Sequence, residues 1–89
     1  MKMFLKTKIK PISHKENVMT EKDGSVKLIN GKEIKWYDLI FASEDSAGQI
    51  RCTKQVVDTY TPLEDVLATF EYDSEHKTVK LRLVEIAPL

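Results

Sequence analysis

The chain has 89 residues, 42% of them hydrophobic, and its 14 Lys and Arg balance its 14 Asp and Glu. This length supports one domain without a second core, and the composition is that of an ordinary soluble folded protein. Cys52 is the only cysteine, which excludes an intrachain disulfide, and we expect it to pack as a small apolar residue. No apolar stretch approaches the roughly 18 residues of a membrane span, so we expect a cytoplasmic protein.

Charge is balanced in total but unevenly distributed along the chain. Residues 1–36 contain nine Lys and four acidic residues, a balance of +5, whereas residues 37–89 contain five basic and ten acidic residues, a balance of −5. A basic segment can present a local positive surface, because exposed charges more than about 10 Å apart are largely screened at 0.1 M salt. This distribution favours a polyanion partner over an enzyme active site.

The first predicted element is a strand. Residues 4–12 alternate with period two, so that the side of Leu5 and Ile9 is apolar. The opposite side carries three lysines, Lys6, Lys8 and Lys10. Pro11 has no N–H to donate to a neighbouring strand, so we expect the strand to end there or to run along a sheet edge.

Two turn signals follow in the basic half of the chain. Asp23-Gly24 predicts a turn after a polar stretch. Asn30-Gly31 predicts a hairpin between strand candidates at 25–29 and 32–43, because a type I′ turn needs two residues with φ > 0. We interpret residues 13–36 as a basic hairpin wing.

The second half continues the strand pattern, with one ambiguity. Residues 49–57 and 77–86 are strand candidates. Residues 61–72 fit both periods: Thr61-Pro62 is a good helix start, yet the later residues alternate as a strand. We favour one helical turn near 62–66 followed by a strand.

The fold predicted from these elements is all-β. Five or six strands in a single domain over residues 1–89 indicate a small five- to six-stranded Greek-key barrel of the OB-like type, with an SH3-like barrel as the alternative. A closed barrel removes vulnerable strand edges. Small β domains also gain buried area by forming homodimers, and we expect one here.

Residues suited to catalysis are few. His14, His76 and Cys52 lack the closely spaced ligand pairs of zinc sites, and the three glycines are isolated, so no phosphate-cradling loop exists. We therefore predict no enzyme activity, no metal, no cofactor and no small-molecule substrate.

Binding of single-stranded nucleic acid has more support, because it needs cations along the phosphates and flat rings on which bases stack. Alternate residues of a strand are about 6.6 Å apart, close to the phosphate spacing of an extended strand. The predicted contacts are Lys6, Lys8, Lys10, Lys32, Lys35, Trp36, Tyr72, Lys77, Lys80 and Arg82. Two alternatives stay open: the lysines form only a solvated strand face, and Trp36 belongs to the core or to a dimer interface.

Several motifs resemble the filamentous-phage gene V proteins. The opening Leu5-Lys6-Thr7-Lys8-Ile9-Lys10-Pro11, the pair Gly31-Lys32 before Tyr37-Asp38-Leu39, and the closing Lys80-Leu81-Arg82-Leu83-Val84 follow the order of similar segments in that family. Tyr37-Asp38-Leu39 and Pro62-Leu63 are also similar to small helix-destabilising proteins of conjugative elements.

The resemblance implies a dimeric OB-like barrel that coats single-stranded DNA without sequence preference. By matched position, Lys32 corresponds to the wing lysine, Lys80 and Arg82 to two closing-strand arginines, and Tyr72 falls beside the aromatic of the last hairpin. The family's wing aromatic aligns with Ile34, so stacking is expected to have moved to Trp36.

The sequence thus predicts a sequence-independent single-stranded DNA-binding protein acting in replication or transfer of a phage, plasmid or conjugative element, with RNA as an open alternative ligand. The rival hypothesis is a small protein-interaction module, or an accessory or inhibitor protein of a mobile element, without nucleic-acid binding.

Overall fold

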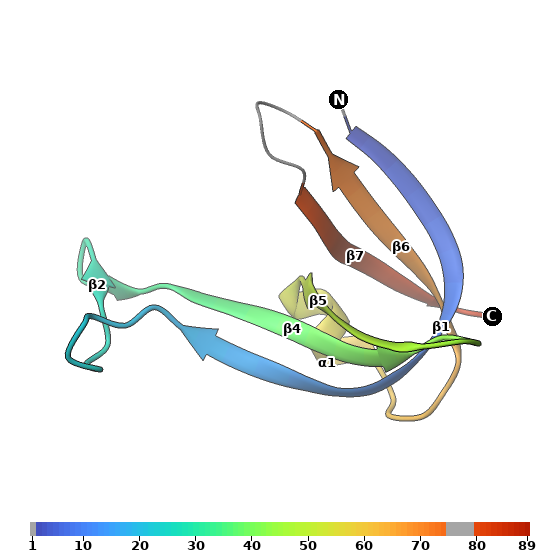
Figure 1. Ribbon diagram of the computed structural model, residues 1–89, viewed down its shortest axis with the longest axis horizontal. Helices are drawn as coiled ribbons and strands as arrows, with labels where there is room; N and C mark the ends of the chain where they lie inside the picture. Colours follow the sequence, from blue (N-terminus) through green and yellow to red (C-terminus); the bar gives the residue numbers. More distant parts are fainter. Residues whose placement is uncertain (1, 75–79) are drawn as a thin grey trace.

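The structure, a computed structural model, describes residues 2–74 and 80–89. Its elements are β1 (Lys2–Val18), β2 (Leu28–Ile29), β3 (Lys32–Glu33), β4 (Lys35–Ala42), β5 (Ala47–Cys52), α1 (Lys54–Thr59), β6 (Val66–Asp73) and β7 (Lys80–Pro88). Five strands close a barrel in the order β1-β4-β5-β7-β6, and β2 and β3 form a small separate sheet (Figure 1). This architecture confirms the predicted small, five-stranded, OB-like barrel. The described residues contain no helix of the length and hydrophobicity needed to cross a bilayer.

The long strand β1 pairs with two neighbouring strands. Its residues 2–9 pair with β6, and its residues from Lys10 onward pair with β4. The register shifts between Pro11 and Ser13. Because proline has no N–H to donate, an interruption of the hydrogen-bond ladder costs little free energy there. The buried Pro11 carbonyl instead accepts a hydrogen bond from Leu63 N at 2.7 Å. The strand therefore does not end at Pro11; it changes partner there and continues to Val18.

Beyond the barrel, the far half of β1 and the start of β4 extend as a two-stranded ribbon that leads into the wing (Figure 1). The predicted hairpin is confirmed: Asn30 and Gly31 have φ of 52° and 77° between β2 and β3. The strand expected at 25–29 is shorter, since only Leu28–Ile29 form β2.

The short helix lies elsewhere than predicted. It spans Lys54–Thr59, so it begins within the segment 49–57 expected to be a strand and ends two residues beyond it, and it does not lie near 62–66. Leu63 has φ of 67°, a left-handed conformation that a right-handed helix cannot contain. Val56 is fully buried in the barrel core and is the only buried residue of α1, so packing outweighs the strand preference of the valines here.

Among the described residues, the core consists of eight buried apolar residues, Ile9, Leu39, Cys52, Val56, Val66, Ala68, Phe70 and Leu83. The prediction that Cys52 packs in the core is confirmed. Burial, and then the charge of Asp38, raise the pKa of the Cys52 thiol from its usual 9.0 to about 11. The thiol is therefore protonated at neutral pH.

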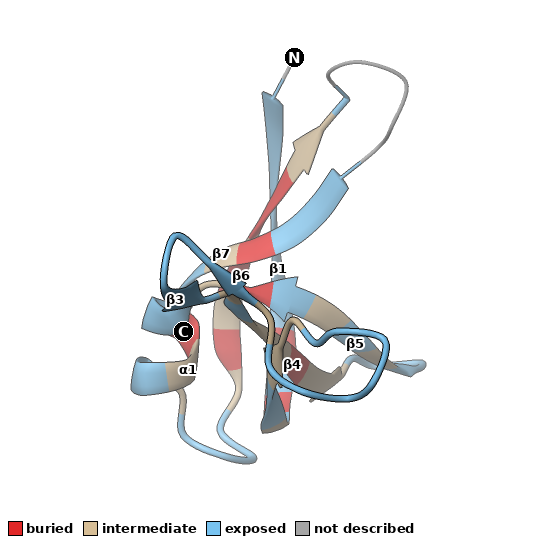
Figure 2. Cartoon of the chain, turned by 90° about the vertical axis from the view of Figure 1, so that its left-hand side faces the viewer, coloured by how far each residue is buried: buried red, intermediate tan, exposed pale blue. Residues whose placement is uncertain are grey.

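The sheet of β1, β6 and β7 extends past this core (Figure 2). Leu83 is fully buried, but two residues earlier Leu81 is 52% exposed, and Leu5 of β1 is 65% exposed. We call the extension the apolar tongue; its inner side carries Met3, Leu5, Tyr72 and Leu81, which follow from the pairings Met3↔Tyr72, Leu5↔Phe70 and Tyr72↔Leu81.

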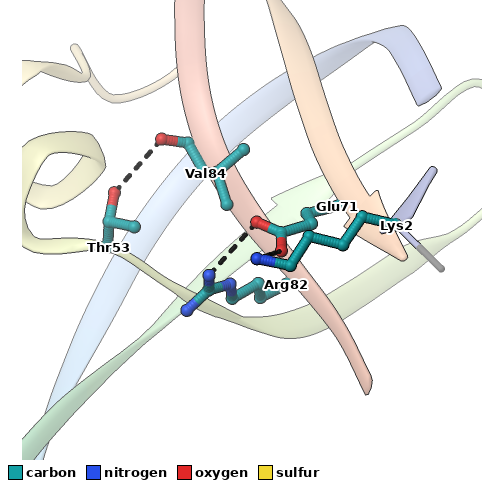
Figure 3. A network of polar contacts seen from close by, with 5 residues as sticks. All are labelled: Lys2, Thr53, Glu71, Arg82 and Val84. Carbon is teal, nitrogen blue, oxygen red and sulfur yellow. Dashed lines mark hydrogen bonds and ion pairs between the residues drawn. The ribbon is translucent and has the colours of Figure 1, made fainter. Parts of the chain in front are cut away.

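Between β5 and β7 the barrel closes through one parallel pair, Cys52↔Leu83. Two hydrogen bonds from Thr53 support it. Its backbone N donates to Leu83 O at 3.2 Å. Its hydroxyl donates to Val84 O at 3.4 Å, as Figure 3 shows. Earlier in both strands no pairing joins β5 to β7 among the described residues, which leaves room for a cleft.

Candidate functional site

The predicted lysine stripe, Lys6, Lys8 and Lys10, lies exposed on the outward side of β1. Lys6 and Lys8 are opposite β6 residues, and Lys10 is opposite Ala42 of β4. None of the three forms an ion pair with any residue that the structure describes. Two of them, Lys8 and Lys10, border a hollow that Glu44 and Asp65 also line. The stripe therefore has acidic neighbours, but its charges form no ion pair among the described residues.

Trp36 lies on the outside of the barrel, not in the core. It is half-buried on β4, opposite Asn17 of β1, and the guanidinium carbon of Arg51 sits 5.5 Å from the centroid of its ring (Figure 1 shows β4 and β5 side by side). We call this surface the tryptophan face; its outward residues on β1, β4 and β5 are Lys15, Asn17, Trp36, Asp38, Gln49 and Arg51. A cation therefore covers part of the ring on which a base would stack.

The one acid of the tryptophan face, Asp38, is hydrogen-bonded to amides. Asn17 Nδ2 donates to Asp38 Oδ2 at 2.9 Å, and Gln49 Nε2 donates to the same oxygen at 3.4 Å. Arg51 lies opposite Asp38 across the strands but forms no ion pair within residues 2–74 and 80–89. Its N–H donors consequently have no carboxylate partner in the part of the chain that the structure describes.

The lysine stripe and the Trp36 ring are not adjacent. Lys10 is the last lysine of the stripe, and Asn17, the partner of Trp36, follows seven residues later on β1. Seven residues of extended strand cover about 23 Å. The two predicted components of the site therefore occupy different stretches of one long strand.

A second surface, which we call the arginine cleft, opens between β5 and β7. Its volume is about 480 Å³, and it is lined by Arg51, Glu71, Asp73, Lys80, Leu81 and Arg82. Three of these side chains are cationic and two are acidic, so the lining has a net positive balance. Arg51 is the described residue that belongs both to this cleft and to the tryptophan face.

Glu71 forms ion pairs with residues of two other strands beside the cleft (Figure 3). Its side chain is only 9% exposed, and its carboxylate oxygens lie 3.1 Å from Arg82 Nη2 and 3.5 Å from Lys2 Nζ. A buried carboxylate needs such partners, since an unpaired buried charge is strongly destabilising. One acid on β6 is thereby tied to β1 and β7. Arg82, predicted to contact DNA, is engaged in this ion pair.

The remaining predicted residues are scattered. Lys32 is exposed on β3 in the wing. Lys35 is 3.1 Å from Glu16 and 3.5 Å from Glu33, and Glu16 first and then Glu33 raise the pKa of its ammonium group. Lys80 is exposed in the cleft, whereas Tyr72 is half-buried in the apolar tongue. Lys77 lies outside the described residues.

Groups suited to metal or nucleophilic chemistry do not assemble in the described part of the chain. No cluster of three His, Cys, Asp or Glu side chains there could hold a metal ion. His14 Nδ1 is hydrogen-bonded to the Tyr60 hydroxyl at 2.8 Å, with the two rings edge to face. His76 lies outside the described residues.

Arg51 and Glu71 were missed by the sequence reasoning. For Arg51 a signal existed: hairpin pairing around the polar loop at 43–46 places it opposite Asp38, and strand alternation turns it outward beside Trp36. For Glu71 no local signal existed, because its partners Lys2 and Arg82 come from two other strands.

Comparison with known proteins adds nothing to this geometry. The chain matches no protein-family model, and no significant match was found among curated proteins or among solved structures.

Proposed function

We propose that the protein binds single-stranded nucleic acid without sequence preference, in the replication or transfer of a phage, plasmid or conjugative element. The observation that carries this proposal is the outward-facing Trp36 ring beside Arg51, a cation that no described carboxylate neutralises. Aromatic rings and cations are the two components that hold unpaired strands.

The position of this ring within the fold gives further support. OB-like barrels recurrently bind oligonucleotides on the outward face of their second and third barrel strands, which are β4 and β5 here. This support is an analogy at the level of the fold, which hosts many functions. The residues themselves supply the specific argument, because the ring lies between the wing, with exposed Lys32, and the arginine cleft, with exposed Lys80.

The proposed mechanism is passive. A protein that binds unpaired strand and not duplex shifts the equilibrium between them by mass action. Each base stacked on Trp36 contributes about 1–3 kcal/mol, and each neutralised phosphate steepens the log–log salt dependence by about 0.7. The lysine stripe serves as a second contact region through charge alone.

The test uses Trp36 as its own probe, since it is the only tryptophan in the chain. Titration with oligo-dT at about 20 mM salt is expected to quench its fluorescence, and about 200 mM salt to restore it. A blunt duplex of the same length should quench far less. If oligo-dT causes neither quenching nor a gel shift at the lower salt concentration, the protein does not have this function.

A second candidate, a protein-interaction module, is favoured by the exposed apolar tongue. Within residues 2–74 and 80–89, strand edges without a pairing partner flank this face, because residues 2–9 of β1 pair only with β6 and residues 80–82 of β7 pair only with β6. Such edges are templates for another chain. The occupant we propose is a second copy, since an apolar patch can meet itself across a two-fold axis and a net charge of zero adds no repulsion.

A homodimer is compatible with strand binding, and a different protein partner is the outcome that separates the two candidates. Capture of one defined protein that survives nuclease treatment, by a chain that binds no oligonucleotide, would favour the interaction module over the first proposal.

A further inference from the structure

Arg51 is shared by two surfaces that the proposed function uses. Its guanidinium carbon lies 5.5 Å from the centroid of the Trp36 ring, and the same side chain lines the arginine cleft with Lys80 and Arg82. The structure therefore places one exposed side chain both over a ring and at the margin of a cleft in which Lys80 and Arg82 lie with Glu71 and Asp73.

Two acids near Arg51, its register partner Asp38 and the cleft residue Glu71, have other partners. Asp38 accepts hydrogen bonds from Asn17 and Gln49, and Glu71 is paired with Arg82 and Lys2. In residues 2–74 and 80–89 no carboxylate forms an ion pair with Arg51. Its contact with the Trp36 ring is a cation–π interaction at an exposed site, which is weaker than a charge-assisted pair of hydrogen bonds to a phosphate.

Arg51 and a stacking base compete for the same place. A base that stacks on Trp36 needs the ring face that the guanidinium covers. Each base of a single strand is linked through its sugar to a phosphate, so a phosphate arrives close to the ring together with the base. Besides Arg51, the arginine cleft is lined by two cations, Lys80 and Arg82, and two acids, so Arg51 itself gives the lining its net positive balance.

We propose that Arg51 is a two-position binding residue. In the free protein it covers Trp36; when an unpaired base takes the ring, Arg51 turns into the arginine cleft and holds the neighbouring phosphate there. The ligand is thus one nucleotide unit, base plus phosphate, of a single strand. This inference rests on the proposed function and deepens it, since a paired base cannot reach the ring and does not release Arg51.

The first position is tested without nucleic acid. Acrylamide quenching of Trp36 is measured in the wild type, in Arg51→Ala and in Arg51→Lys, with Lys54→Ala as the matched control. Lys54 is an exposed cation three residues later, outside the lining of the cleft. Arg51→Ala is expected to increase quenching and Lys54→Ala to leave it unchanged. Equal quenching in Arg51→Ala and the wild type would overturn the proposal.

The second position is tested with fluorescein-labelled oligo-dT across a salt series. Arg51→Ala is expected to bind about tenfold more weakly at low salt and to lose about 0.7 from the log–log salt slope. Arg51→Lys should keep the slope, because it keeps the charge. Should Arg51 only shield the ring, Arg51→Ala would bind more tightly with an unchanged slope, and the proposal would be wrong. Circular dichroism and thermal unfolding establish that each variant is folded.

Different results would overturn the proposed function and the proposal for Arg51. A wild type that does not bind oligo-dT overturns the proposed function and this inference with it. A wild type that binds, together with an Arg51→Ala variant of wild-type affinity and slope, overturns the inference alone.

Discussion

The two halves of β1 share one alternating pattern but differ in what covers them. Its near half, residues 2–9, pairs with β6, carries lysines outward and begins with an apolar side that no described element covers. Its far half pairs with β4 and lies beside the outward Trp36 ring and Arg51. Alternation therefore decides which side a residue faces, whereas burial and chemistry depend on the neighbouring strands.

The largest expected effect is a difference in stability between two variants of β7, one in the barrel and one in the apolar tongue. Leu83 and Leu81 lie on the same side of β7, yet the first is fully buried and the second 52% exposed. Leu83→Ala should lower the free energy of unfolding by about 2–5 kcal/mol, because it leaves a cavity. Leu81→Ala should lower the free energy of unfolding of the monomer by less than about 1 kcal/mol. Urea denaturation at low protein concentration measures both, and similar losses would contradict the division.

The second prediction is that a second copy of the chain covers the apolar tongue. Leu5→Lys places a charge on its apolar inner side and is expected to convert a dimer into monomers in sedimentation velocity experiments. Phe4→Lys is the matched control, because Phe4 is also exposed but faces outward on the same strand. A wild type that sediments as a monomer at all concentrations, or equal behaviour of the two variants, would refute a dimer at this face.

A third pair of variants distinguishes the contribution of the Trp36 ring to oligo-dT binding from that of the lysine stripe. Trp36→Ala should weaken oligo-dT binding about tenfold or more while leaving the salt slope unchanged, because stacking is lost but no cation is. Lys8→Ala should weaken binding less and reduce the slope by about 0.7, since it removes one phosphate contact. Labelled oligonucleotide titrations at several salt concentrations test this, and a Lys8→Ala slope equal to the wild-type slope would remove the stripe from the interface.

The last expected effect is confined to alkaline pH and comes from Cys52 in the barrel. Its pKa is raised from 9.0 to about 11 on folding, by burial first and by Asp38 second. The unfolded chain thus loses this proton at lower pH than the folded protein. The stabilising contribution is complete below pH 9 and is lost as the pH rises toward 11. Cys52→Ala should show a flatter decline of unfolding free energy in this window; an identical decline would assign it to other groups.

Local signals predicted much of the fold. The hairpin at Asn30-Gly31 and the inward side of Ile9 and Leu83 follow from turn chemistry and alternation, which act within a few residues. The site was predicted less well. Trp36 and the lysine stripe were identified, but their separation along β1 depends on strand pairing.

By itself the sequence determined most of the strands, the hairpin wing and the two sides of the strands, because each of these depends on residues close together in the chain. Only the tertiary structure decided that β1 changes partner at Pro11, that Val56 belongs to a helix and that Glu71 is paired with Lys2 and Arg82. The physical reason is that these features depend on which distant segments pack together, and packing outweighs local preference wherever apolar surface is buried.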